Sequence, residues 1–97
     1  MPPSVGGVKQ FLVEVFVPRS EADALAAAEQ RAREAARRLS ENAAEIRYVR
    51  ATYVPEDETC FHVYEAVSAD AVGEAARRAA LTFDRVAEAV VEAAETR

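Results

Sequence analysis

Segments with period-two alternation and segments with helical spacing follow one another along this chain, and their order limits the folds it can adopt. The first alternating segment runs from Phe11 to Val17 and is stopped by Pro18. Two further segments, Ile46 to Val54 and Cys60 to Val67, are rich in β-branched and aromatic residues. The short polar link between these two makes them an antiparallel hairpin. Three strands are therefore expected, two of them adjacent.

Two amphipathic helices are expected between these strands. The first begins at Ser20, with Asp23 at the position of a weak capping box, and ends near Asn42. The second is capped by Ser68. The apolar stripes are Leu25, Ala28, Ala32, Ala35, Ala36 and Leu39 in the first helix and Val72, Ala75, Ala76 and Ala79 in the second. Because both stripes consist mostly of alanine, the helices can lie close to a sheet.

The last segment fits two patterns. Its apolar residues after Phe83 have helical spacing, but Val86, Glu88 and Val90 also alternate as in a strand. Without a further strand, one apolar edge of the first strand would stay uncovered, which folded proteins avoid. We therefore expect a strand over Asp84 to Val91.

These elements predict an α+β fold of the ferredoxin-like βαββαβ type. A right-handed crossover gives an antiparallel sheet in the order 4-1-3-2, with both helices on one face. The length of 97 residues leaves room for one domain, which we place at residues 9–91. Residues 1–8 and 92–97 are expected to form flexible tails.

Composition and charge limit the kinds of partner that this chain is expected to bind. The net charge of -5 argues against nucleic-acid binding, and no apolar run is long enough to span a membrane. The first residues lack the pattern of a secretory signal, so a cytoplasmic location is expected. Cys60 is the single cysteine, which excludes an intrachain disulfide and leaves it as a thiol or a ligand.

Alternation assigns each strand residue to one face of the sheet. The set expected beneath the helices is Phe11, Val13, Val15, Val49, Ala51, Tyr53, Phe61 and Val63. The set expected on the open face is Leu12, Glu14, Phe16, Tyr48, Arg50, Thr52, Cys60, His62 and Tyr64. Because this open face is too aromatic to remain exposed, we expect two sheets to pair in a homodimer of the dimeric α+β barrel type, enclosing a pocket between them.

Cys60 and His62 are the strongest candidates for metal ligands. Residues at i and i+2 of a strand point the same way, and a thiolate with an imidazole suits Ni(II), Cu(II) or Zn(II). Glu14 is a candidate third ligand, although pairing with Arg50 is the favoured alternative. The acidic loop of Glu56, Asp57 and Glu58 offers oxygen ligands, or is simply a polar turn. The alternative for Cys60 and His62 is a purely structural role, in which the two side chains are packed and hydrogen-bonded and bind no metal.

Four runs of sequence resemble a known family. They are YVPEDETCFHVYEA from Tyr53 to Ala66, SADAV from Ser68 to Val72, RRAALTFDRV from Arg77 to Val86, and FLVEV from Phe11 to Val15. They are similar to a small bacterial family of ferredoxin-like proteins described as nickel-binding. The resemblance implies a homodimer, Ni(II) as a ligand, no established enzymatic activity and a strand after Phe83. It carries over only Cys60 and the acidic loop as candidate ligands.

Three functions compete at this point. The leading one is a dimeric binding protein for a divalent transition metal, with nickel first. The second is a cofactor-free enzyme or small-molecule binder with a pocket of about 300 Å³ or more on the open face, His62 as base and Arg50 steadying an anion. The third is a structural or regulatory dimerisation module. No catalytic residue is assigned, because Cys60 lacks an orienting third group for nucleophilic attack.

Overall fold

The computed structural model describes residues 8–90 and confirms the βαββαβ order. The elements are β1 (Lys9–Phe16), the 3₁₀ helix η2 (Arg19–Ala24), α1 (Leu25–Glu41), β2 (Ile46–Val54), the 3₁₀ turn η3 (Pro55–Asp57), β3 (Thr59–Ala66), α2 (Ala69–Arg78) and β4 (Arg85–Ala89). The expected tails fall on residues of which only Val8 is described.

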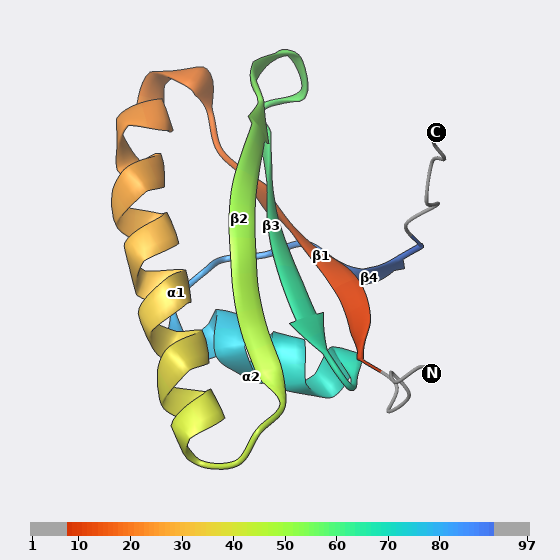
Figure 1. The fold of residues 1–97 in the computed structure, drawn as a ribbon. Helices are drawn as coiled ribbons and strands as arrows, with labels where there is room; N and C mark the ends of the chain where they lie inside the picture. The colour runs from red at the N-terminus through yellow and green to blue at the C-terminus, as the bar shows by residue number, and fades with distance from the viewer. Residues whose placement is uncertain (1–7, 91–97) are drawn as a thin grey trace, which may run out of the picture.

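The four strands form one antiparallel sheet in the order β2-β3-β1-β4, as predicted. β1 lies between β3 and β4, and both helices pack on one face of the sheet (Figure 1). The ambiguous last segment is a strand, which pairs Val86 with Val13 of β1. β4 is shorter than predicted, and Val91 lies outside the described residues. The edge of β1 is thus covered.

The helices follow the predicted stripes, with one correction. Ala32, Ala35 and Ala36 of α1 are buried, as are Val72, Ala75 and Ala76 of α2 and Ala79, which follows that helix. The Ser68 side chain caps α2 by accepting from the Ala71 N–H at 3.2 Å. The expected helix start at Ser20 is wrong, because the Glu21 N–H bonds to the Pro18 carbonyl at 2.8 Å and makes a 3₁₀ segment before α1.

Strand register decides which side chains lie beneath the helices, and it contradicts the prediction for β3. Val13 of β1 is opposite His62, and Val15 is opposite Cys60, so these residues share the helix-covered face. Cys60, His62 and Tyr64 are all buried there, not on the open face. Alternation could not show which face of β3 is covered by the helices, because β3 is a central strand with apolar residues on both faces. Phe61 and Val63 occupy the open face instead.

A β-bulge explains the second error. The register of β2 against β3 shifts between Tyr48 and Arg50, so Val49 is the extra residue. Tyr48 therefore faces the helices and is 4% exposed, whereas Arg50 and Thr52 lie on the open face as predicted. A single extra residue moves every side chain on one side of it to the opposite face.

Neither helix of the described residues has the length and apolar character that crossing a bilayer would require.

Candidate functional site

Three polar side chains form a buried row beneath the helices. The Tyr48 hydroxyl lies 2.7 Å from Nδ1 of His62. On the other side of the ring, Nε2 of His62 lies 3.5 Å from Sγ of Cys60. His62 is 1% exposed and Cys60 is fully buried. β2 supplies the phenol and β3 the imidazole and the thiol, so the row depends on the bulge that turns Tyr48 inward.

Burial keeps every member of this row uncharged at neutral pH. Desolvation lowers the pKa of His62 to about 4, because the charged imidazolium would lose its water, while Glu29 opposes this shift and Arg31 adds to it. Desolvation also raises the pKa of Cys60 to about 11. The pKa of Tyr48 is raised for the same reason. The site thus offers a neutral imidazole next to a protonated thiol.

The phenol can select the tautomer of the imidazole. When Nδ1–H donates to the Tyr48 oxygen, the lone pair of Nε2 faces Cys60 and is free to bind a metal. A partner on the other ring nitrogen is the usual outer support of a metal-binding histidine. Tyr48 therefore has the place of an orienting residue.

The spacing of the two donor atoms is compatible with a shared metal ion. Distances of about 2.3 Å to sulfur and about 2.0 Å to nitrogen place the donors about 3.5 Å apart at a tetrahedral angle, but about 3 Å apart at a right angle. The separation between Nε2 and Sγ is 3.5 Å. The pair therefore fits two corners of a tetrahedral ion without movement and needs a small contraction for a square-planar one. Among residues 8–90, no three His, Cys, Asp or Glu side chains gather as a complete metal site.

The other predicted ligands lie elsewhere. Glu14 is on the open face and accepts a hydrogen bond from Nε of Arg85 at 2.8 Å, so the favoured pairing with Arg50 is wrong. In the acidic loop, Glu56 and Asp57 are exposed in η3. The Glu58 carboxylate accepts from the backbone N–H of Arg19 at 2.9 Å, which ties the hairpin to the start of η2. None of these carboxylates joins Cys60 and His62.

A hollow of about 290 Å³ has His62 in its wall. It lies between the end of β1, η2, the first turns of α1 and the loop before β4. Its polar residues, besides His62, are Glu21, Arg31 and Thr82. This hollow has a similar volume to the pocket expected beside His62, but it lies on the helix side of the sheet and has charged residues in its wall, so it is not the apolar pocket expected on the open face. Arg50 is on the opposite face, so the predicted pairing of His62 with Arg50 in one pocket is wrong.

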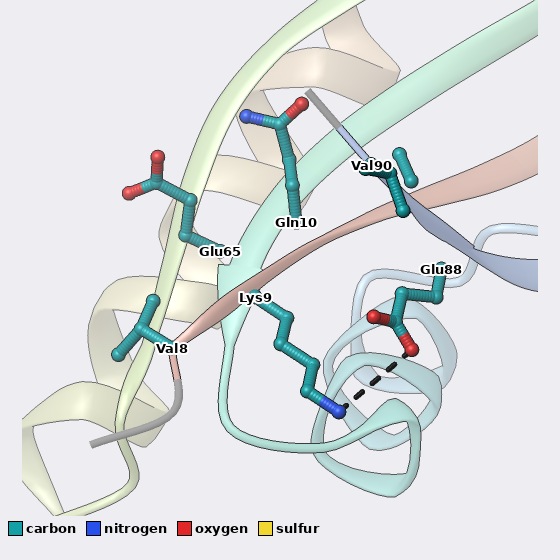
Figure 2. Close-up of a pocket in the computed structure, with 7 residues that line it drawn as sticks. Val8, Lys9, Gln10, Glu65, Glu88 and Val90 are labelled. Atoms are coloured by element: carbon teal, nitrogen blue, oxygen red, sulfur yellow. Dashed lines mark ion pairs between the residues drawn. The ribbon is translucent and has the colours of Figure 1, made fainter. Parts of the chain in front are cut away.

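A second hollow, of about 480 Å³, has few groups that could react or bind a metal. It lies around the start of β1, where Lys9 and Glu88 approach each other at 3.8 Å (Figure 2). Gln10 and Glu65 add polar groups, and Val90 at its edge is 80% exposed. An exposed ion pair of this kind contributes little energy and no reactive group.

Sequence reasoning missed Tyr48 as a partner of His62, and it missed Arg31 altogether. The contact of Tyr48 with His62 depends on a β-bulge, and no glycine or other turn residue in the sequence indicates that bulge. Arg31 stands among other arginines of α1 in the sequence, and no spacing predicts its contact with the Ala79 carbonyl at 2.8 Å. The sequence signal for both was absent.

Comparisons with known proteins agree on one family. A family model described as "Nickel responsive protein SCO4226-like" matches residues 11–89. A solved structure of similar fold is that of SCO4226 from Streptomyces coelicolor A3(2), with a TM-score of 0.66 and 22% identity, covering 87% of this chain and 99% of that one. No curated protein matches the chain. The match spans all four strands and both helices, and the chain belongs to the SCO4226-like family of nickel responsive proteins.

Proposed function

We propose that this protein binds a divalent transition metal, nickel first, through Sγ of Cys60 and Nε2 of His62. The observation that carries the proposal is the buried pair itself, with its donor atoms 3.5 Å apart and one imidazole edge in the wall of a hollow. Membership of a nickel responsive family supports nickel over other ions. Imidazole and thiolate are also good ligands for zinc, so Zn(II) is the natural competitor.

The remaining ligands of the metal would come from water or a small molecule. The described residues offer no third donor at the pair. His62 contacts the 290 Å³ hollow, which has room for exogenous ligands. A site of this kind binds and releases metal more readily than a closed four-ligand site, which suits a responsive protein in the reducing cytoplasm where we place it. We assign it no catalysis.

A calorimetric titration tests the site by measuring how many protons are released when the metal binds. At neutral pH, the pKa of about 11 keeps Cys60 protonated and the pKa of about 4 keeps His62 neutral. Binding of Ni(II) should therefore release about one proton per ion, which comes from the thiol. Titrations in buffers of different ionisation enthalpy measure this number.

Two variants serve as controls. Cys60→Ala should abolish binding and proton release. Glu56→Gln combined with Asp57→Asn should leave both unchanged, because the acidic loop takes no part. Binding that survives in Cys60→Ala, or that releases no proton, would contradict the proposed ligands. Circular dichroism confirms that each variant is folded.

We also propose that two copies pair through the open face of the sheet. Leu12, Phe16 and Phe61 provide its apolar surface, and Phe16 is 58% exposed. Arg50 and Thr52 lie beside them, as predicted, whereas Tyr48 and Tyr64 do not. Because Cys60 and His62 are on the other face, the dimer would not enclose the metal.

Sedimentation equilibrium tests this pairing. Phe16→Glu places a charge on the proposed contact surface, at the end of β1, and should convert a dimer to a monomer, since a desolvated unpaired charge is costly. Val8→Glu changes an exposed residue just before β1 and is the matched control. A wild-type monomer, or a dimer that tolerates Phe16→Glu, would overturn the proposal.

A further inference from the structure

The hollow beside His62 has two residues of opposite charge in its wall that do not form an ion pair with each other. Arg31 and Glu21 both line it. None of the ion pairs among residues 8–90 includes either residue. By contrast, Arg33, Arg37 and Arg38 of the same helix are each paired with a glutamate. Arg31 is thus distinguished from its neighbours on α1.

Arg31 is held in place by its own backbone contact. Its Nε donates to the carbonyl of Ala79 at the end of α2, at 2.8 Å. Such a contact satisfies a free carbonyl of the helix terminus and fixes the guanidinium. The two terminal nitrogens make no hydrogen bond to the described residues and keep the fork geometry that binds a carboxylate.

The rest of the wall sets the size and polarity of an occupant. Val15, Leu25, Ala28 and Leu81 give it an apolar part, and Thr82 adds a hydroxyl. A volume of about 290 Å³ is at the lower end for ligand sites. Since one water occupies about 30 Å³ of liquid, the space suits a molecule of roughly ten heavy atoms. Arg31 and Glu21 carry one positive and one negative charge, so the wall of the hollow has no net charge.

We propose that this hollow binds a small zwitterion of the apolar amino-acid class. Arg31 binds the carboxylate, Glu21 binds the ammonium group, and the aliphatic wall packs against the side chain. A simple carboxylate would leave Glu21 as an unfavourable neighbour, and a simple amine would do the same for Arg31. The proposal does not rest on the proposed metal site, so it is tested on protein freed of metal by a chelator.

The experiment is calorimetry with matched probes. L-alanine, L-valine and L-leucine are titrated first, followed by 4-methylpentanoate and 3-methylbutylamine, which each lack one charge of leucine. At least one amino acid should bind saturably, and 4-methylpentanoate and the amine should bind at least about tenfold more weakly than leucine, because each loses a charge-assisted hydrogen bond.

Variants locate the binding. Arg31→Gln and Glu21→Gln should each weaken the amino acid by about tenfold or more, and Arg31→Lys should restore part of the loss because it keeps the charge. Arg38→Gln, two turns further along α1, should have no effect. The proposal would be overturned if none of the three amino acids bound. It would also be overturned if 4-methylpentanoate bound as tightly as leucine, or if Arg38→Gln weakened amino-acid binding as much as Arg31→Gln.

Discussion

Lowering the pH from about 7 to about 4 is expected to reduce the free energy of unfolding by about 3 kcal/mol through His62 alone. In the unfolded chain this imidazole takes up a proton near its ordinary pKa of 6.5, but in the folded protein only near 4. Between these values the unfolded state binds more protons, so stability falls as the pH falls. Below about 4 both states are protonated and the contribution stops changing.

The assignment can be checked because His62 is the one histidine of the chain. Urea unfolding curves at several pH values give the slope, and His62→Gln gives the background from the carboxyl groups. The difference between the two proteins should appear between pH 6.5 and about 4. A wild-type slope equal to that of His62→Gln over this range would show that the imidazole is solvated or otherwise compensated.

Truncation of Tyr64 is expected to be the most damaging single change in the core. Its side chain is fully buried, and its ring is nearly perpendicular to that of Tyr48 at a centroid distance of 5.1 Å. Tyr64→Ala removes a whole aromatic ring and should cost about 3 to 5 kcal/mol of unfolding free energy. Chemical denaturation measures this loss directly.

Two smaller changes separate the ring of Tyr64 from its hydroxyl. The Tyr64 hydroxyl is buried and has no hydrogen-bond partner among the described residues. Tyr64→Phe should therefore be neutral or stabilising, because it removes an unsatisfied polar group. Tyr48→Phe should destabilise by about 1 to 3 kcal/mol, since it leaves His62 without its partner. Equal losses in the two Phe variants would mean that Tyr64 has a partner after all.

The fold was largely predictable because it depends on the order of the elements. Proline at position 18 and serine at position 68 mark boundaries, and alanine stripes mark the buried helix faces. The choice of a strand for β4 came from the need to cover β1, a tertiary argument that local periodicity contradicted. Which face of β3 lies beneath the helices was not predictable. Both faces carry apolar residues, so alternation does not distinguish the buried face from the open one. The bulge at Val49 has no sequence mark.

The candidate site was predictable only in part, for related reasons. Cys60 and His62 lie together because two residues apart on a strand share a face, whichever face that is. Their burial beneath the helices, and with it the shifted pKa values, follows from the register of β3. The partnership with Tyr48 follows from the bulge. The hollow with Arg31 and Glu21 joins four separate segments, and no spacing along the chain could reveal it.

X-ray absorption at the nickel edge tests the metal site most directly. The protein loaded with one equivalent of Ni(II) should show one sulfur neighbour and the scattering pattern of an imidazole, with oxygen or nitrogen ligands completing the shell. The sulfur contribution should vanish in Cys60→Ala. A shell of oxygen and nitrogen alone, identical in the wild type and in Cys60→Ala, would contradict the assignment of nickel to Cys60 and His62.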